Sequence, residues 1–317
     1  FTPSKIQKPI LLRARVTKST GAWYKLLTSE NEEVDARLKG AMRLDGLTST
    51  NPVAVGDYVN LENEEGDWMI SSVEKRENYI IRKSPAKRTF SHILASNLDQ
   101  AFILVTASKP RTSSGFIDRF LITAEAYHIP SVLVFNKQDI LTEKDLDIQN
   151  RFIEIYSSIG YQCKLVSSIT GDGVEALKAM LANKTTLLIG HSGVGKSTLA
   201  NAIDKDLNLK TGEVSIKHEK GKHTTTFAEM FQLSFGGSII DIPGIKEFGV
   251  VGFDKYEINH FFMEMARLLP KCKFNNCMHL NEPKCAVMDA LENGEVSEER
   301  YKNYLGILED LEEAQDY

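Results

Sequence analysis

The chain has 317 residues, 42% of them hydrophobic, and a formal net charge of −5. That length is enough for more than one domain with a proper hydrophobic core. The acidic charge argues against a protein that coats nucleic acid without specificity, because such binding scales with the number of phosphates neutralised. There is no secretory signal and no apolar run that could span a bilayer, so we expect a cytoplasmic, soluble protein without a membrane partner. We also expect a monomer.

Residues 1–75 have the pattern of a small β-barrel. Between positions 5 and 72, short β-like runs alternate with turn segments such as "STG", "VGD" and "EEGD". A rhythm of about five strands without a long helix is typical of an OB-fold. Trp23, Tyr24 and Trp68 could stack nucleic-acid bases, but aromatic residues in a small barrel more commonly belong to its core.

Residues 76–252 alternate strand and helix patterns. Buried-strand patterns that end in polar loops occur at 101–108, 131–139, 164–173, 185–193 and 238–244. Helical spacing occurs between the first two, and the alternation predicts an α/β domain with a doubly wound sheet. Ligands of such sheets bind beyond the carboxyl ends of the strands. The basic stretch 82–90, interrupted by Pro85, is interpreted as a linker.

Residues 253–317 have a helical pattern. The segment 256–269 is predicted to be one helix, and the segment 297–314 an acidic, amphipathic one. The residues expected on one face of the first helix are Ile258, Phe261, Phe262, Met265 and Leu268.

The sequence "GHSGVGKS" (190–197) fits the phosphate-binding pattern G-x-x-x-x-G-K-[ST], with a strand pattern before it and a helix pattern after it. Backbone N–H groups of such a loop cradle phosphates, Lys196 would hold the β- and γ-phosphates, and Ser197 would bind Mg²⁺. The alternative is a glycine-rich turn with an incidental lysine. The predicted GTP-binding residues of this loop are Gly190, His191, Ser192, Gly193, Val194, Gly195, Lys196, Ser197 and Thr198.

The tetrapeptide "NKQD" predicts a guanine-reading loop at Asn136, Lys137, Gln138 and Asp139. Asp139 can accept two hydrogen bonds from guanine, whereas adenine has no such pair of donors. Asn136 can contact the base edge and tie this loop to the phosphate loop, and the stem of Lys137 can cover the ring. The alternative is a polar strand end followed by a turn.

Further motifs complete a GTPase set. "SSIT" follows another strand, where Ser167 and Ser168 would bracket the base. In "DIPG", Asp241 would hold Mg²⁺ through water and the amide of Gly244 would meet the γ-phosphate.

The first switch is expected within "GKHTTT" (221–226), which should offer a threonine to Mg²⁺. Thr225 is preferred, while Thr224 and Thr226 stay open.

The order of these motifs differs from that of ordinary GTPases. Both base-reading segments precede the phosphate loop, and the usual order is restored only by reading the domain cyclically. Joining the old termini and opening the loop after the second switch keeps every strand contact. We therefore predict a circularly permuted GTPase, in which the second switch leads directly into the helical region and would pull on it.

Hydrolysis needs a group that orients water. Ile245 stands where Ras-like enzymes place glutamine, so slow unaided hydrolysis of GTP to GDP and phosphate is expected. His223 is the best substitute as catalytic residue. The alternative is an exposed loop histidine without a catalytic task.

A metal site is predicted in "CKFNNCMHLNEPKC" at Cys272, Cys277, His279 and Cys285. Three thiolates and one imidazole form a closed tetrahedral set suited to structural Zn²⁺, one ion per chain. In a cytosolic chain, reduced cysteines favour metal binding or burial over disulfides. Cys163 is interpreted as a buried apolar residue.

Together these motifs resemble the ribosome small-subunit-dependent GTPase family known as RsgA or YjeQ. The resemblance covers nearly the whole chain, including "STGAWY", "GHSGVGKSTL", "DIPGIKEFG" and the cysteine-rich run. It implies an OB barrel, a permuted GTPase domain and a helical zinc-binding domain, with boundaries expected at 1–75, 76–252 and 253–317. It also implies late maturation of the small ribosomal subunit, rRNA binding, hydrolysis stimulated by the subunit, and a catalytic role for His223.

One stretch departs from this family. The barrel carries "VDARLKGAMR" where a more basic, cysteine-led run is expected, so the RNA face at Arg37, Lys39 and Arg43 is less well defined than the fold. The alternative function is a GTP-dependent switch with non-ribosomal protein or RNA partners. A P-loop kinase is disfavoured by Asp139, and a plain single-strand-binding barrel by the intact Lys196 and Asp241.

Overall fold

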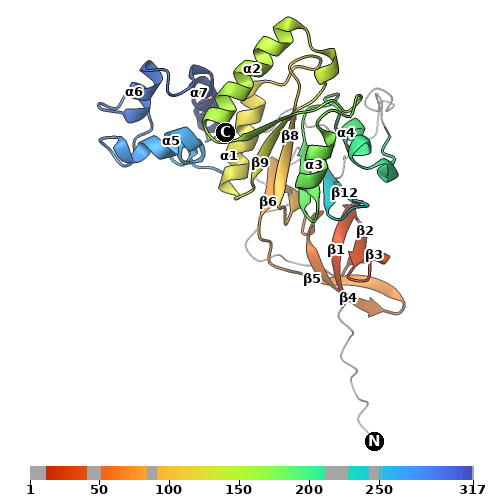
Figure 1. Ribbon diagram of the computed structural model, residues 1–317. Coiled ribbons are helices and arrows are strands. Elements are labelled where there is room, and N and C mark those ends of the chain that lie inside the picture. Colours follow the sequence, from red (N-terminus) through yellow and green to blue (C-terminus); the bar gives the residue numbers. More distant parts are fainter. Residues whose placement is uncertain are drawn as a thin grey trace, which may run out of the picture.

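The structure, a computed structural model, describes residues 12–40, 51–83, 91–210, 228–242, 250 and 252–315. An eleven-stranded sheet has the strand order β10-β9-β8-β11-β13-β12-β1-β2-β3-β5-β4, and β6 pairs with β7 in a separate two-stranded sheet. Figure 1 shows the α/β region in the centre, the barrel below it and the C-terminal helices to one side.

The N-terminal strands close into the predicted five-stranded barrel, because β1 pairs with both β2 and β4. Its core is built from alternating residues such as Val16, Leu26 and Ile70, all fully buried. Tyr24 also belongs to this core, whereas Trp23 is 41% exposed and lies under the guanidinium of Arg37, 3.7 Å from the ring centroid. The strands are β1 (Leu12–Ser19), β2 (Tyr24–Thr28), β3 (Glu33–Leu38), β4 (Tyr58–Glu64) and β5 (Asp67–Val73).

A two-stranded ribbon connects the barrel to the α/β region. It consists of β6 (Tyr79–Lys83) and β7 (Ser91–Ser96), with Arg82 opposite His92 and Lys83 opposite Ser91. The interpretation of residues 82–90 as a linker was therefore wrong for Arg82 and Lys83, which belong to strand β6. The buried Ile80 and Ile81 extend the strand into the basic residues, and residues 84–90 lie outside the described part.

Five parallel strands form the centre of the α/β region, with β12 (Glu229–Gln232) antiparallel at their border. The near-continuous apolar sequences of β8, β9 and β11 agree with burial on both faces, whereas β10 at the edge of the sheet is partly exposed. Figure 1 shows the helices on both faces of this sheet. The parallel strands are β8 (Gln100–Val105), β9 (Ser131–Phe135), β10 (Gln162–Leu165), β11 (Thr185–Ile189) and β13 (Ser238–Asp241).

Helices α1 (Ser114–Ala126) and α2 (Glu143–Ser158) pack into one core, and α3 (Val174–Leu181) and α4 (Lys196–Ile203) pack into a second core. This arrangement confirms the predicted doubly wound sheet. Two short 3₁₀ turns follow strand and helix ends, η1 (Gln138–Ile140) and η2 (Lys205–Leu207).

The C-terminal region is helical, but the prediction of one helix over 256–269 was wrong. The segment divides at Phe262, whose φ of −89° and ψ of 105° are extended. This break lets the fully buried Phe262 pack edge-on against Tyr304, with 5.5 Å between ring centroids, so tertiary packing overrides the helical pattern. The elements are η3 (Ile258–Phe261), α5 (Met263–Leu268), η4 (Leu269–Lys271), α6 (Ala286–Glu292) and α7 (Glu298–Gln315).

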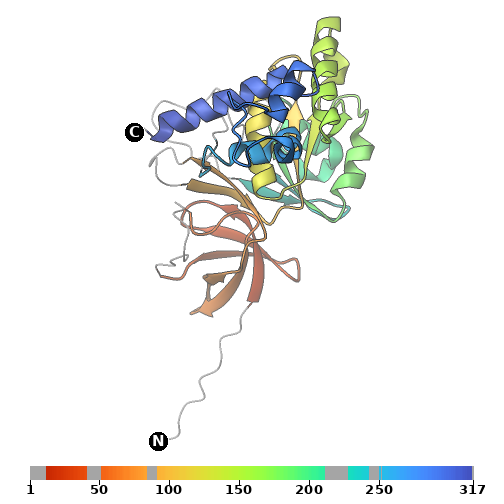
Figure 2. The ribbon, with the colours of Figure 1, turned by 90° about the vertical axis from the view of Figure 1, so that its left-hand side faces the viewer.

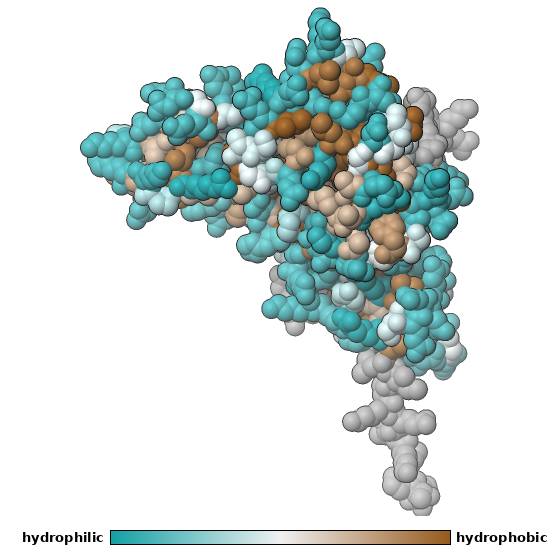
Figure 3. Space-filling view, viewed as in Figure 1, coloured by the Kyte–Doolittle hydropathy of each residue, from teal (hydrophilic) through white to brown (hydrophobic). Residues whose placement is uncertain are grey.

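Figure 2 shows the long α7 running past the helices of the α/β region, with the barrel below. Within the described residues, no helix is both long and apolar enough to cross a bilayer. Hydrophilic side chains cover most of the visible face of the barrel and the C-terminal helices in Figure 3.

Candidate nucleotide site and metal centre

The predicted nucleotide-binding segments come together at one edge of the sheet. "NKQD" follows β9, "SSIT" follows β10, the phosphate loop follows β11, and Asp241 ends β13. Because these strands are parallel, their carboxyl ends share one edge.

Asn136 joins three of these segments. Its Nδ2 donates to Val194 O in the phosphate loop at 2.9 Å, and its Oδ1 accepts from the amide and the hydroxyl of Ser168. Asn136 is only 2% exposed, so its hydrogen-bonding groups are committed to holding the loops together. A Cβ at Gly195 would lie 2.5 Å from Asn136 Nδ2, and the φ of +96° there also requires glycine.

Lys137 and Asp139 are each oriented by another loop. Lys137 has a left-handed φ of 67°, and its Nζ donates to Lys109 O at 2.7 Å. Burial lowers the pKa of Lys137, which the charge of Asp139 partly offsets. Ser167 donates to Asp139 Oδ1 at 2.6 Å, which leaves the other carboxylate oxygen outside this bond. Gln138 pairs with Gln149 of α2.

The phosphate loop leads into α4, whose first residue is Lys196. The ammonium of Lys196 donates to Gly190 O at 2.9 Å and to His191 O at 3.3 Å. The residue is 8% exposed, and burial lowers its pKa while the charge of Asp241 opposes this. A buried cation beside the free N–H groups of a helix start is an arrangement that binds phosphate.

The remaining predicted residues of this loop differ in how far they are buried. The ring of His191 packs on that of Phe116, with 4.1 Å between centroids. Ser197 and Thr198 lie half-buried in the first turn of α4, and Ser192 and Gly193 are exposed.

Asp241 has the environment of a cation ligand. Its Oδ1 is buried and makes no hydrogen bond, and burial raises its pKa even though Lys196 lowers it. A buried carboxylate oxygen without a partner is costly, so the residue fits the predicted Mg²⁺ site. His223, Thr225 and Gly244 lie outside the described residues.

The sequence reasoning missed the loop after β8. Lys109 O accepts from Lys137, and Pro110 lies 3.4 Å from the position of a Cβ on Gly193. This loop therefore supports both the base-reading loop and the phosphate loop. Its place after a buried parallel strand was the signal available in the sequence.

The predicted metal ligands converge in the C-terminal region. The ligand atoms of Cys272, Cys277, His279 and Cys285 all lie within 4.8 Å of one another. A tetrahedron with Zn–S bonds of about 2.3 Å has edges of about 3.8 Å, so a single ion fits. His279 is fully buried, and its Nδ1 lies 3.3 Å from Cys285 Sγ. Cys163 is half-buried in β10, outside this group.

Helix α7 and an acidic side chain hold the metal-binding loop. Tyr301 donates to His279 O at 2.7 Å and Tyr304 to Met278 O at 2.6 Å. Glu282 accepts from the amides of Met278, Leu280 and Asn281. Burial alone would raise the pKa of Glu282, but these amides lower it overall. The loop conformation is thus fixed by groups other than the ligands.

Family models and curated relatives agree on one family. An RsgA GTPase model matches residues 73–251, and an RsgA N-terminal domain model matches residues 14–68. A small ribosomal subunit biogenesis GTPase RsgA from Christiangramia forsetii is 49% identical, over 95% of this chain and 97% of that protein. A protein of the same description from Flavobacterium psychrophilum is 50% identical, over 94% and 93% respectively.

Solved structures agree on the fold. The crystal structure of YjeQ from Thermotoga maritima has a TM-score of 0.75 and 33% identity, covering 95% of this chain and 99% of that one. The structure of YloQ, described as a circularly permuted GTPase, has a TM-score of 0.69 and 27% identity, covering 99% and 98%. The chain therefore belongs to the RsgA family of GTPases and has the circularly permuted GTPase fold that the order of its motifs predicts.

Proposed function

We propose that this GTPase acts in the late maturation of the small ribosomal subunit, binding its rRNA and hydrolysing GTP to GDP and phosphate when the subunit stimulates it. The observation that carries the proposal is the meeting of three loops at Asn136, on the same sheet edge as a buried lysine and a half-buried aspartate whose Oδ1 is buried without a hydrogen bond. Relatives that are 49% and 50% identical are described as small ribosomal subunit biogenesis GTPases, which supports the small subunit as the partner.

In this proposal the roles at the nucleotide site follow the sequence motifs, and for the described residues the positions of the side chains support them. Asp139 reads guanine, Lys137 covers the ring, and Lys196 and the loop amides hold the phosphates. Magnesium would be held by Ser197, Asp241 and Thr225. His223 would orient the attacking water, and Gly244 would meet the γ-phosphate.

The proposal extends to the rest of the chain. We propose a monomer with boundaries near 75 and 252, acting in the cytoplasm, with a structural zinc ion held by the Cys₃His group. The donor set supports zinc, because three thiolates and an imidazole suit that ion better than hard cations, which prefer oxygen.

The test is GTP turnover by the wild type and His223→Ala, alone, with purified small subunits and with large subunits. We expect small subunits to stimulate the wild type, and the variant to bind GTP but lose the stimulation. Large subunits are the matched control, since they present similar rRNA charge. Equal stimulation by both subunits, or by neither, would contradict the ribosomal role and favour a non-ribosomal partner.

A further inference from the structure

The base-reading loop is held not only by other loops but also by a helix. Gln138 Nε2 donates to Gln149 Oε1 at 2.7 Å, and Gln149 Nε2 donates back to Gln138 Oε1 at 2.9 Å. Gln138 Nε2 also donates to Phe135 O at 3.1 Å. Gln149 is 2% exposed, so water competes little for these bonds.

Helix α2 gives this contact a firm base. A capping box starts the helix, in which Asp145 N donates to Thr142 Oγ1 at 3.3 Å and Thr142 N donates to Asp145 Oδ2 at 3.1 Å. Further along, Phe152 and Tyr156 are buried in the core. Helix α2 itself therefore fixes the position of Gln149, independently of the contact with the loop.

The loop needs such a support. Lys137 has a left-handed φ of 67°, a conformation that is unfavourable for a residue with a side chain. Backbone strain of this kind persists only where surrounding contacts over-determine it. Gln138 lies between Lys137 and Asp139, so its hydrogen bonds to Phe135 O and Gln149 restrain the backbone from which both neighbours extend.

We infer that Gln149 is a positioning residue for guanine recognition. It acts by forming two hydrogen bonds with Gln138 and thereby fixing the carboxylate of Asp139. The inference rests on the proposed assignment of Asn136–Asp139 as the base-reading loop. Gln149 touches none of the groups proposed to hold phosphate or magnesium. Its contribution should therefore appear in the binding of the base, which GTP and GDP share, and not in the hydrolytic step.

The experiment compares Gln149→Met with the wild type, using GTP, GDP, ATP and inosine triphosphate, which lacks the 2-amino group of guanine. Methionine keeps the volume and removes both hydrogen bonds. We expect affinity for GTP and GDP to fall by the same factor, about tenfold for a lost buried hydrogen-bonding pair, and the preference for GTP over inosine triphosphate to shrink. KM should rise while kcat is retained.

Two variants serve as controls. Asn150→Leu removes the neighbouring, exposed amide of the same helix and should leave affinity and preference unchanged. Gln149→Glu keeps an acceptor for Gln138 Nε2 but cannot donate to Gln138 Oε1, so its affinity should lie between those of the wild type and Gln149→Met. This variant also tests the inference if Gln149→Met fails to fold.

The outcomes separate the inference from the proposed function. A wild type that prefers GTP to ATP, together with Gln149 variants of unchanged affinity and lower melting temperature, would reduce Gln149 to a purely structural residue and overturn the inference alone. A wild type without preference for GTP over ATP would overturn the base-reading loop as well. Unequal losses for GTP and GDP would also contradict the inference, because they would place the effect at the phosphates.

Discussion

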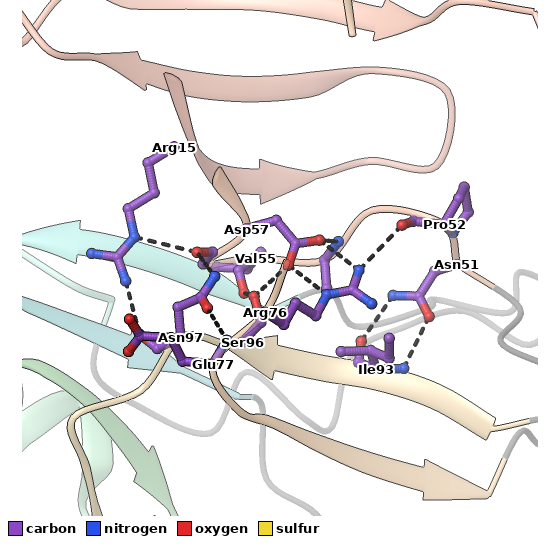
Figure 4. A network of polar contacts seen from close by, with 12 residues as sticks. Arg15, Asn51, Pro52, Val55, Asp57, Arg76, Glu77, Ile93, Ser96 and Asn97 are labelled. Carbon is purple, nitrogen blue, oxygen red and sulfur yellow. Dashed lines mark hydrogen bonds and ion pairs between the residues drawn. The ribbon is translucent and has the colours of Figure 1, made fainter. Parts of the chain in front are cut away.

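The barrel and the C-terminal helices are joined to the α/β region by two buried charge networks of different composition. At the barrel, Arg76 donates to both oxygens of Asp57 at 2.7 Å, and Ser96 donates to Asp57 Oδ1 at 2.6 Å. Figure 4 shows these groups facing one another, with Arg15 and Asn97 alongside. A Cβ on Gly56 would lie 2.1 Å from Ser96 O, so the barrel approaches the ribbon closely. One cation is matched by one anion.

At the C-terminal helices one cation serves two anions. Arg300 of α7 donates to Asp118 Oδ1 of α1 at 2.5 Å and to both oxygens of Glu264 of α5 at 2.7 and 2.8 Å. Tyr156 and Asn303 donate to Asp118 as well. The second carboxylate charge is compensated by hydrogen-bond donors and not by a second cation. This network therefore depends more on its arginine than the network at the barrel does.

The two junctions also reach different parts of the α/β region. The barrel pairs with β12, the strand that begins opposite Asp241, whereas α7 contacts α1 through Arg300 and Asp118, and α2 reaches Asp118 through Tyr156. Both tryptophans of the chain, Trp23 and Trp68, belong to the barrel. Tryptophan fluorescence therefore reports on the barrel and far-UV circular dichroism on the helices, which allows the junctions to be tested separately.

The largest effect is expected from removing the proposed metal ion, because its Cys₃His ligand group lies within the C-terminal helical region and the described residues of the barrel hold no such group. Binding of structural zinc supplies folding free energy, on the order of 10 kcal/mol in small zinc peptides. Without metal, burial raises the pKa of Cys277 to about 12 and also raises that of Cys285, so both thiols are neutral. Metal binding must displace these protons, and affinity should fall as pH falls.

The measurement is unfolding after chelation, with any released metal identified and titrated by a colorimetric indicator. We expect the circular-dichroism transition to move to lower denaturant while tryptophan fluorescence changes little. Cys163→Ser is the control, since Cys163 lies outside the ligand group. A fluorescence transition that moves equally would show that the barrel depends on the metal too.

Replacing Arg300 by methionine should be the next largest effect. Breaking a buried ion pair by removing one partner typically costs about 3–5 kcal/mol, because a buried charge is left uncompensated. Burial already raises the pKa of Asp118, and Arg300 opposes this rise. A carboxyl whose pKa is higher in the folded than in the unfolded protein takes up a proton on folding. The loss in free energy of unfolding caused by Arg300→Met should therefore become smaller as pH falls.

Urea unfolding followed by circular dichroism near neutral and mildly acidic pH measures this effect. Arg119→Met is the matched control, because its partner Asp310 is 61% exposed and such pairs contribute less than about 1 kcal/mol. If Arg300→Met lowered the free energy of unfolding no more than the control does, the expected dependence of this junction on its arginine would be wrong.

Replacing Arg76 by methionine should cost somewhat less, about 3 kcal/mol. Asp57 would keep the hydroxyl of Ser96 and the amide of Ala54, 2.8 Å from its Oδ2, and only one carboxylate would lose its cation. The transition seen by tryptophan fluorescence should move more than that seen by circular dichroism. Arg13→Met, at a pair whose arginine is 56% exposed, should have little effect on either. Equal shifts of both signals would mean that the barrel and the helices unfold together.

The sequence was sufficient where function is carried by short motifs between a strand and a helix. "NKQD", the phosphate loop and the Cys₃His spacing were each found from local pattern, and the structure brings the described members of each together. Parallel strands explain this success, because their carboxyl ends share an edge whatever the distance along the chain. The permuted order could be recognised for the same reason.

The buried charge networks could not be predicted in this way. Asp118 and Arg300 are 182 positions apart, and a polar residue in a helical pattern indicates an exposed face until the partner helix is placed. Gln149 was overlooked for the same reason. The pairing of β12 with the barrel and the break at Phe262 depend on tertiary packing, which no local period encodes.

The smallest effect is expected at the second contact between the barrel and the α/β region. Strands β1 and β12 share the single register pair Lys18 and Glu229, whose side chains form an ion pair at 2.8 Å and are 34% and 36% exposed. A pair this accessible contributes about 0.2–1 kcal/mol. A double-mutant cycle with Lys18→Met and Glu229→Gln, followed by tryptophan fluorescence, should give a coupling energy in that range.

The exposed pair of Lys25 and Asp35, 3.5 Å apart, provides a second cycle within the barrel and should give a similar or smaller value. If the Lys18–Glu229 coupling instead approached the loss in Arg76→Met, the barrel would be held as firmly by β12 as by its buried junction. Because β12 begins opposite Asp241, the barrel would then be attached to the strand that pairs with β13, which carries the proposed magnesium ligand. A small coupling energy would leave Arg76 as the main side-chain attachment of the barrel.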